Sequence, residues 1–339
     1  MVTLRACVIC AATALCVLAD EAGAQTPRPG PSRAALAFVT NEESGTISVI
    51  DVTLRRVVAT IPVGARPRGI QVSPDARQVF VAVSDQSPNA ESDRDAIVVL
   101  DARNRRETGR FKAGTDPEQL AIAPDGSRVY AANEDAGTAT VIDLRTRRVV
   151  STAVVGIEPE GIAASPDGRW IYVTAETSNS VSAVDARTAT VAANMLVDPR
   201  PRAVAFSPDG RRAYVTAEIG GTLSVVDTRS HTVSTTIELE GGDGKPVGVA
   251  VSPDGRRVYV ANGGANRVSV IDATRLRVVG SVSVGRRPWG IAVSPDGRFV
   301  YTANGLSDSV SVIDAATLRV IATIAVGKRP WGVAIAEQR

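Results

Sequence analysis

Short stretches of alternating apolar and polar residues recur along the whole chain and predict β-strands throughout. One strand of each repeat opens on an aromatic residue, and these residues follow one another at spacings of 42, 50, 42, 42, 45 and 42: Phe38, Phe80, Tyr130, Tyr172, Tyr214, Tyr259 and Tyr301. The next strand ends on an aspartate: Asp51, Asp101, Asp143, Asp185, Asp227, Asp272 and Asp314. β-Branched segments such as Val57 to Ile61, and returns such as Gly290 to Ser294, complete each repeat. Four short strands in about 42 residues leave no room for helices.

Turns of the form Ser-Pro-Asp-Gly separate the strands and fix the repeat. They precede six of the aromatic residues by seven positions and open at Ser73, Ala123, Ser165, Ser207, Ser252 and Ser294. Ala76 replaces the Gly in the first copy, and Ala123 replaces the Ser in the second. This residue order suits a type I turn. Seven such units predict an all-β, seven-bladed β-propeller over residues 36–339, with four antiparallel strands per blade. The segment Gly332 to Ala336 matches the first strand of a repeat without its continuation, so we expect this C-terminal strand to complete the N-terminal blade.

The repeat motifs also resemble a known family. Tyr172-Val-Thr174, Tyr214-Val-Thr216 and Phe38-Val-Thr-Asn41, with the Ser-Pro-Asp-Gly turns, are similar to the YVTN β-propeller repeat. The series of proline motifs, such as Arg66-Pro-Arg68-Gly and Arg329-Pro-Trp331-Gly, resembles the PQQ-dependent catabolism-associated β-propeller proteins most closely. That resemblance implies an association with periplasmic quinoprotein alcohol oxidation and establishes no activity.

The first residues predict export. An apolar run from Ala6 to Ala19 follows Arg5 and precedes Ala22-Gly23-Ala24, so residues 1–24 read as a signal peptide and residues 25–35 as a Pro-rich linker. We therefore expect a periplasmic or secreted protein without a membrane span. All three cysteines, Cys7, Cys10 and Cys16, lie in this leader. The mature chain is thus predicted to have no disulfide, thiolate metal site or covalently attached haem.

Charge and histidine content narrow the classes of function. The chain has 38 Lys and Arg against 36 Asp and Glu, well mixed in sequence, which argues against a nucleic-acid partner. Its single histidine, His231, falls in an outer turn that we expect to be exposed. Histidine-dependent catalysis and histidine-ligated haem are therefore disfavoured.

Comparison of the repeats predicts where a site lies. Two insertions, Gln86 to Asp95 and Glu240 to Lys245, both fall on one rim of a propeller. On that rim a different residue follows the proline of each blade connection, and two glutamates lie on neighbouring loops. We expect these residues to surround the channel mouth as a site for a ligand or partner: Arg68, Glu118, Glu160, Arg202, Trp289, Trp331, Glu176 and Glu218, with Val247 among them.

Two interpretations of this mouth remain open. Its arginines and glutamates can simply pair with one another while the tryptophans fill the channel. Alternatively, guanidinium groups bind carboxylates of a ligand and indole faces stack on a flat ring, as PQQ would require. The insertion also carries oxygen ligands of the kind calcium prefers: Asp85, Asn89, Glu91, Asp93 and Asp95. Their spacing matches no rigid calcium loop, which favours a solvated acidic loop over a calcium site.

The preferred interpretation of function is a non-catalytic binding module. It predicts no resident cofactor and a periplasmic protein partner, such as a quinoprotein dehydrogenase or its cytochrome. The alternative comes from lactonase-type propellers, a neighbouring family. That resemblance implies a hydrolase that uses Glu118, Glu160, Glu176 or Glu218 at the channel mouth.

Overall fold

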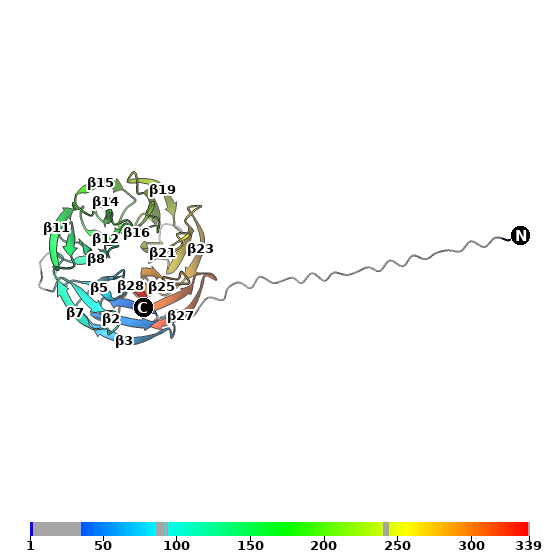
Figure 1. The fold of residues 1–339 in the computed structure, drawn as a ribbon, viewed down its shortest axis with the longest axis horizontal. Helices are drawn as coiled ribbons and strands as arrows, with labels where there is room; N and C mark the ends of the chain where they lie inside the picture. Colours follow the sequence, from blue (N-terminus) through cyan, green and yellow to red (C-terminus); the bar gives the residue numbers. More distant parts are fainter. Residues whose placement is uncertain (3–34, 86–91, 93, 240–243, 338–339) are drawn as a thin grey trace. The chain divides into compact units, whose positions relative to one another are not determined.

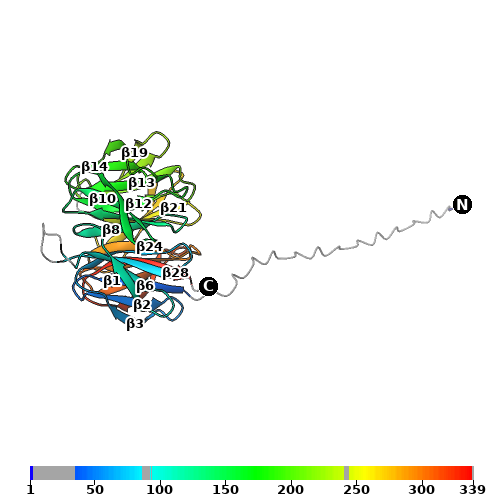
Figure 2. The same cartoon turned by 60° about the vertical axis from the view of Figure 1, so that its left-hand side comes forward.

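The computed structural model describes residues 1–2, 35–85, 92, 94–239 and 244–337. The chain divides into two units, Met1–Ser32 and Arg33–Arg339. Residues 3–24 of the predicted leader and residues 25–34 of the predicted linker lie outside the described residues. The second unit is a ring of seven four-stranded antiparallel sheets (Figures 1 and 2), which confirms the predicted seven-bladed propeller.

The blades are numbered here from the one that contains both ends of the ring, and their strands are given from the channel outward. Blade I consists of β28 (Pro330–Glu337), β1 (Ala35–Asn41), β2 (Thr46–Asp51) and β3 (Arg56–Pro62). Blade II consists of β4 (Pro67–Val72), β5 (Gln78–Val83), β6 (Ala96–Asp101) and β7 (Glu107–Phe111). Blade III consists of β8 (Pro117–Ile122), β9 (Arg128–Asn133), β10 (Thr138–Asp143) and β11 (Arg148–Val154). Blade IV consists of β12 (Pro159–Ala164), β13 (Trp170–Ala175), β14 (Ser180–Asp185) and β15 (Val191–Leu196).

The last three blades follow the same plan. Blade V consists of β16 (Pro201–Phe206), β17 (Arg212–Ala217), β18 (Thr222–Asp227) and β19 (Thr232–Glu238). Blade VI consists of β20 (Pro246–Val251), β21 (Arg257–Asn262), β22 (Arg267–Asp272) and β23 (Arg277–Ser283). Blade VII consists of β24 (Pro288–Val293), β25 (Phe299–Asn304), β26 (Ser309–Asp314) and β27 (Arg319–Ala325).

The ring closes through the strand predicted to close it. β28 pairs antiparallel with β1, with Phe38 opposite Ala334 and Ala35 opposite Glu337. The segment that ends the ring therefore forms the channel-side strand of the blade that begins it. Closure leaves blade I with the same four strands as the others and removes two unpaired strand edges.

The hydrophobic core lies between blades. Each buried cluster joins two adjacent blades: one combines Phe38 of blade I with Val79 and Leu100 of blade II, and another combines Tyr172 of blade IV with Val215 of blade V. The structure places the repeated aromatic residues two or three positions inside their strands and not at the start, where the sequence pattern predicted them. These residues supply the largest fully buried side chains. Outer strands alternate between buried and exposed positions, as β19 and β23 do, because only one of their faces meets a neighbour.

Arginines at the start of the second strand bind across the blade boundary on the rim opposite the insertions. Arg128 Nη1 donates a hydrogen bond to the Ala186 carbonyl at 2.7 Å, and Arg212 Nη1 donates to the Ala273 carbonyl at 2.6 Å. Arg257 binds the Ala315 carbonyl in the same way. These bonds tie each blade to the next at the outer turn.

His231 corrects the prediction of an exposed turn histidine. Blade IV carries Trp170 where blades III, V and VI carry the linking arginine, and His231 of blade V packs edge-on against this ring, with centroids 4.4 Å apart. Its Nδ1 lies 2.7 Å from the Tyr172 hydroxyl, within hydrogen-bond distance. Burial lowers the pKa of His231, with Arg169 adding to the effect. The histidine is thus a half-buried contact between two blades.

Among the residues that the structure describes, no helix has the length and apolar character needed to cross a lipid bilayer.

Candidate functional site

Three positions of the repeat meet at one rim of the propeller. The first is the residue before the proline of each blade connection, called here the before-proline ring: Arg66, Asp116, Glu158, Arg200, Lys245, Arg287 and Arg329. The second is the residue after that proline, the after-proline ring: Arg68, Glu118, Glu160, Arg202, Val247, Trp289 and Trp331. The third lies four residues after the repeated aromatic residue, the loop ring: Glu42, Ser84, Glu134, Glu176, Glu218, Gly263 and Gly305.

The backbone holds these rings in a defined relation. All seven residues of the before-proline ring have positive φ, between 43° and 64°. This conformation costs about 1 kcal/mol for a residue with a side chain, and a following proline normally favours extended backbone. The loop ring offsets part of that cost, because its N–H groups donate to the before-proline carbonyls: Glu134 to Asp116 at 3.0 Å and Glu176 to Glu158 at 2.8 Å. The turn therefore brings the before-proline and loop-ring residues of each blade together at the mouth, and both are charged in blades I, III, IV and V.

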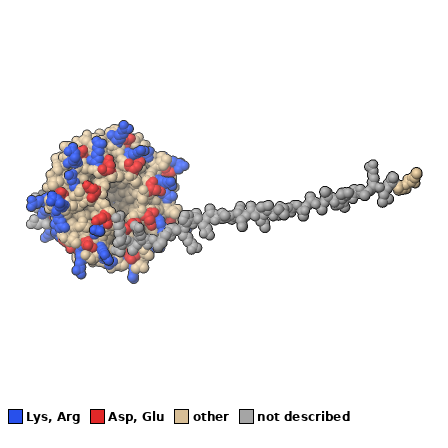
Figure 3. All heavy atoms as spheres, viewed as in Figure 1, with Lys and Arg blue, Asp and Glu red and all other residues tan. Residues whose placement is uncertain are grey.

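A cavity of about 470 Å³ opens at this rim, a volume suited to a small ligand. Figure 3 shows one face of the propeller hollowed at its centre, with acidic side chains around the hollow. Residues of all three rings line the cavity, together with Leu306 and Pro330: Glu42, Arg66, Arg68, Glu134, Glu160, Glu176, Arg200, Arg202, Arg287, Trp289, Gly305, Arg329 and Trp331.

Six of the eight predicted site residues line this cavity: Arg68, Glu160, Glu176, Arg202, Trp289 and Trp331. Glu118 and Glu218 do not. Glu118 is fully buried and contacts Arg68 and Arg66, and Glu218 is 5% exposed and contacts Arg202 and Arg287. These two carboxylates lie behind the arginines and hold them in place.

Glu134 and Glu42 were not predicted as site residues, although their positions in the repeat indicated them. They occupy the same repeat position as Glu176 and Glu218, four residues after the aromatic of blades III and I. The before-proline arginines Arg66, Arg200 and Arg287 were missed as well. The backbone of this position turns into positive φ, and proline context alone does not predict that turn.

One wall of the cavity is built around two arginines of the after-proline ring. Arg68 Nε lies 3.0 Å from Glu42 Oε1, and its Nη1 contacts Glu118 and lies 3.7 Å from Glu134 Oε2. Arg202 is 8% exposed; its Nη1 lies 2.9 Å from Glu160 Oε1 and contacts Glu176. Each guanidinium is thus held by three carboxylates, since Glu218 also lies 3.8 Å from Arg202 Nε.

Two carboxylates of this wall titrate near neutral pH. Burial raises the pKa of Glu134 to about 7, and the neighbouring Glu160 adds to the shift. Burial also raises the pKa of Glu176 to about 7; Arg202 opposes the shift and Glu160 supports it. A carboxylate with such a pKa can exchange a proton with a substrate at physiological pH.

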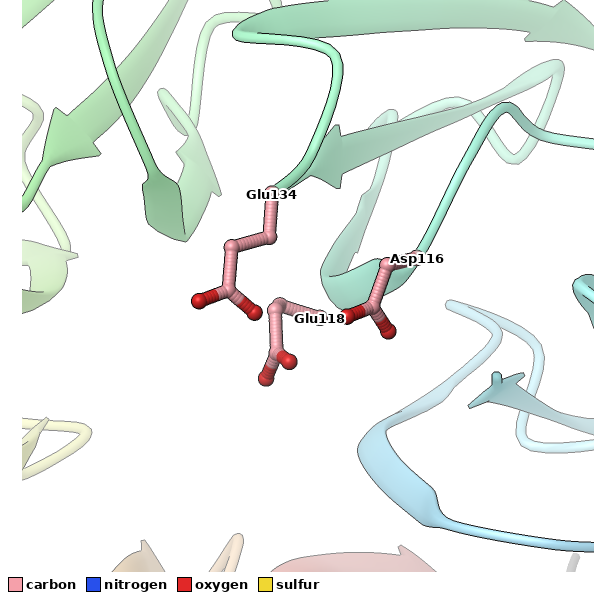
Figure 4. A group of neighbouring side chains, drawn as sticks. All are labelled: Asp116, Glu118 and Glu134. Carbon is pink, nitrogen blue, oxygen red and sulfur yellow. The ribbon is translucent and has the colours of Figure 1, made fainter. Parts of the chain in front are cut away.

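Carboxylates also gather at the blade III side of the mouth. Ligand oxygens of Asp116, Glu118 and Glu134 all lie within 4.8 Å of one another (Figure 4). Guanidinium groups already contact this cluster: Arg66 Nη1 lies 3.4 Å from Asp116 Oδ2, and Arg68 contacts Glu118. The two arginines thus supply the positive charge that a metal ion would otherwise bring.

Most of the predicted calcium ligands lie outside the described residues, namely Asn89, Glu91 and Asp93. Asp95 is 2% exposed, and its carboxylate accepts hydrogen bonds from the N–H of Asp85 at 2.8 Å and of Asp116 at 3.4 Å. Asp85 in turn accepts a hydrogen bond from the Ser92 hydroxyl. Asp95 therefore anchors the end of the insertion to the before-proline ring.

The opposite wall is aromatic. The rings of Trp289 and Trp331 lie 6.0 Å apart at an angle of 39°. The guanidinium carbons of Arg202 and Arg287 lie over the Trp289 ring, 5.0 and 4.7 Å from its centre. The sequence predicted that the tryptophans stack on a flat ring of a ligand. At Trp289 this position is already occupied by the guanidinium groups of Arg202 and Arg287.

Two family models match the chain. The choice-of-anchor I domain model matches residues 30–199, and the model of the lactonase family, described as a seven-bladed β-propeller, matches residues 188–319. No curated protein matches the sequence.

Solved structures similar to this chain are propellers of comparable size. Hydrazine synthase from Kuenenia stuttgartiensis is 23% identical, with a TM-score of 0.74 over 88% of this chain and 99% of the matched one. A putative 6-phosphogluconolactonase from Bacteroides fragilis is 18% identical, with a TM-score of 0.72 over 92% and 100%. A second putative 6-phosphogluconolactonase, from Bacteroides uniformis, is 18% identical, with a TM-score of 0.73 over 89% and 99%. At these identities the likeness concerns the fold.

These findings correct the predicted function. The expectation of a non-catalytic accessory to a PQQ-dependent oxidation system is wrong, because the lactonase family model matches the chain and the similar structures include two putative lactonases. The findings favour the hydrolase that was the alternative.

The family assignment rests on the extent of the matches. The lactonase model covers the blades that carry Arg202, Glu218 and Trp289, and the choice-of-anchor I model covers those that carry Arg68, Glu134 and Glu176. The second match spans half of the chain. The chain is thus a seven-bladed β-propeller that belongs to the choice-of-anchor I domain family and also matches the lactonase family in its C-terminal blades.

Proposed function

We propose that the protein is a lactonase-like hydrolase that opens a lactone ring in the cavity at the channel mouth. The observation that carries this proposal is the wall where Glu134 and Glu176, both with pKa values near 7, face the cavity beside Arg68 and Arg202. The match to the lactonase family model supports it. Ester hydrolysis needs a base for water and a positive group for the oxyanion, and this wall offers both.

Glu134 is the better candidate for the general base. Glu176 is already committed to guanidinium groups, with Arg200 Nε at 2.6 Å and Arg202 in contact. Among the residues that the structure describes, Glu134 forms one ion pair, which is longer, at 3.7 Å to Arg68, and its side chain is 26% exposed. Its carboxylate is therefore free to orient a water molecule next to a guanidinium.

The reaction then follows from these positions. Glu134 accepts a proton as the water oxygen bonds to the lactone carbonyl carbon, and Arg68 stabilises the negative charge that develops on the carbonyl oxygen. The ring C–O bond breaks, and the leaving alkoxide takes the proton back from Glu134. The product is a hydroxy acid, and the carboxylate of Glu134 is regenerated. Arg202, held by Glu160, Glu176 and Glu218, is placed to bind a further oxygen of the substrate.

Hydrolysis of a lactone panel tests the proposal. The panel contains 6-phosphoglucono-δ-lactone, δ-gluconolactone and dihydrocoumarin, each measured against its spontaneous hydrolysis. We expect the protein to accelerate at least one of them and Glu134→Gln to lower that rate about 10²- to 10⁴-fold, the usual contribution of a general base. The matched control is Glu43→Gln, which removes an exposed carboxylate from the same rim and should keep the rate.

Two results would overturn the proposal. One is the absence of acceleration over the whole panel. The other is equal activity of Glu134→Gln and the wild-type protein, which would remove Glu134 from the reaction.

We further propose that the protein works outside the cytoplasm, on the basis of the leader pattern of residues 1–24. Mass spectrometry of the protein purified from its native cells tests this: a mature N-terminus at Gln25 supports export, and an intact N-terminus at Met1 contradicts it. The relationship of the repeats to the YVTN family stays a prediction.

A further inference from the structure

The part of the cavity over blades VII and I differs from the rest of the mouth. The loop ring carries glutamate in blades I, III, IV and V but glycine in blades VI and VII. Gly305, of blade VII, lines the cavity, whereas Gly263, of blade VI, does not. The glycine at position 305 therefore determines the shape of this part of the cavity.

The backbone does not require a glycine there. A Cβ atom added to Gly305 would meet the Pro330 carbonyl oxygen at 3.4 Å and the Arg287 carbonyl oxygen at 3.5 Å, which are ordinary contact distances, and φ is not positive. A side chain is thus tolerated locally, and its absence leaves space that a glutamate fills in four other blades. We call this space, bounded by Gly305, Leu306, Trp331, Arg287 and Arg329, the Gly305 lobe.

The lobe is apolar at its base and rim. Trp331 is 7% exposed at its base, and Leu306 is 54% exposed beside the opening. Trp289 adjoins Trp331 but is covered by guanidinium groups. The surfaces that remain for a ligand are those of Trp331, Leu306 and Pro330, and they suit a flat apolar group.

The lobe also carries two arginines, Arg287 and Arg329, that have fewer carboxylate partners than the other arginines of the cavity wall. On the opposite wall Arg66, Arg68 and Arg202 each contact three carboxylates. Among the described residues, the only carboxylate in an ion pair with Arg287 is Glu218, at 3.1 Å, and the only one in an ion pair with Arg329 is Glu42, at 3.7 Å. The Arg329 side chain is 58% exposed. An anion bound here gains a guanidinium partner without displacing a network of carboxylates.

We propose that the Gly305 lobe binds the non-reacting part of the substrate, and that this part is a flat apolar ring with a carboxylate. The ring lies against Trp331 and Leu306, and the carboxylate lies between Arg287 and Arg329. The substrate class is then an anionic lactone fused to, or substituted with, an aromatic ring. The inference rests on the proposed hydrolase function for ring opening, but the binding step stands independently of it.

Calorimetric titration with coumarin-3-carboxylate, a benzo-fused lactone that carries a carboxylate, tests the lobe directly. We expect the wild-type protein to bind it and Gly305→Gln to weaken binding at least tenfold, because glutamine fills the lobe without adding charge. Ala136→Gln is the control: it adds a glutamine side chain at an exposed position of the corresponding loop in blade III, outside the cavity. Its affinity should stay within twofold of wild type.

Two further variants distinguish the effect of the shape of the lobe on affinity from the effect of its charge and from a loss of folding. Gly305→Ala adds only the tolerated Cβ and should give an intermediate loss of affinity with an unchanged melting temperature. Arg329→Gln should weaken coumarin-3-carboxylate at least fivefold while leaving the affinity for uncharged coumarin within twofold.

The outcomes distinguish this inference from the proposed function. If the protein hydrolyses δ-gluconolactone but does not bind coumarin-3-carboxylate at millimolar concentration, the lobe assignment is wrong and the hydrolase stands. Equal affinities of Gly305→Gln and Ala136→Gln also overturn the assignment. If binding depends on Gly305 but no lactone is hydrolysed, the lobe stands and the hydrolase falls.

Discussion

Replacing Glu134 by glutamine is expected to make the protein more stable while it removes the proposed activity, and the stabilisation should depend on pH. Burial and the neighbouring Glu160 raise the pKa of Glu134 from 4.5 to about 7. Below pH 4.5 the carboxyl group is protonated in both the folded and the unfolded chain, so the substitution changes little. Between pH 4.5 and 7 the unfolded chain loses this proton before the folded chain does, and folded wild-type protein loses stability relative to Glu134→Gln.

The size of the effect follows from the shift. A difference of about 2.5 pKa units corresponds to about 3 kcal/mol at 1.36 kcal/mol per unit, an upper value for a side chain that keeps some contact with water. The unfolding entropy of a domain of this size is about 0.6 kcal/mol/K, so the melting temperature of Glu134→Gln should exceed that of wild type by roughly 5 °C at pH 8. The difference should reach its plateau above pH 7.

Urea unfolding of both proteins at pH 4.5, 6, 7 and 8 measures this difference, with melting temperatures as a second readout. Glu43→Gln serves as the control for loss of an exposed carboxylate from the same rim. If Glu134→Gln is as stable as wild type at pH 8, or less stable, the ionised carboxylate is well satisfied in the folded protein. The argument that burial prepares Glu134 as a base would then be refuted.

Three further predictions concern the pH dependence of hydrolysis and two contacts between blades. The rate of lactone hydrolysis should rise with pH and level off above about 7, because Glu134 must be ionised to accept a proton; a pH–rate profile that is flat from pH 5 to 8 would contradict this. Arg212→Ala should lower the free energy of unfolding by about 2 kcal/mol, because the hydrogen bond from Arg212 to the Ala273 carbonyl is lost. Arg211 is exposed, so Arg211→Ala should change the free energy of unfolding little, and urea unfolding of the two variants measures the difference. Tyr172→Phe should cost about 1 kcal/mol through loss of the contact with His231, and an unchanged urea midpoint would show that this contact does not stabilise the boundary of blades IV and V.

The fold could be predicted from the sequence because the same turn and strand pattern is repeated in each blade. One Ser-Pro-Asp-Gly turn is a weak signal, but six copies at a constant distance from an aromatic residue fix both strand number and register. The same comparison identified β28 as the strand that completes blade I, which the structure confirms. The burial of His231 was not predicted, because it depends on Trp170, 61 positions earlier in the sequence. At this position blade IV has a tryptophan where the neighbouring blades have an arginine.

The candidate site was accessible only in part. Repeat alignment places Arg68, Glu160 and Arg202 near one another, and the same alignment would have added Glu134 and Glu42. Spacing cannot show that Arg202 reaches across to cover Trp289, or that Glu118 lies behind Arg68 and not in the cavity. Those contacts depend on side-chain direction across blades, and they decide which charges remain available to a ligand.

The pairing of β28 with β1 also governs when the site comes into existence during synthesis. Trp331 and Arg329, which bound the Gly305 lobe, belong to the last strand and to the turn before it. A nascent chain that has produced blades II to VII already holds Glu134, Arg68, Arg202 and Trp289, but it lacks Trp331 and a closed ring. Assembly of the cavity is therefore coupled to closure of the ring, because β28 both pairs with β1 and supplies Trp331 to the cavity.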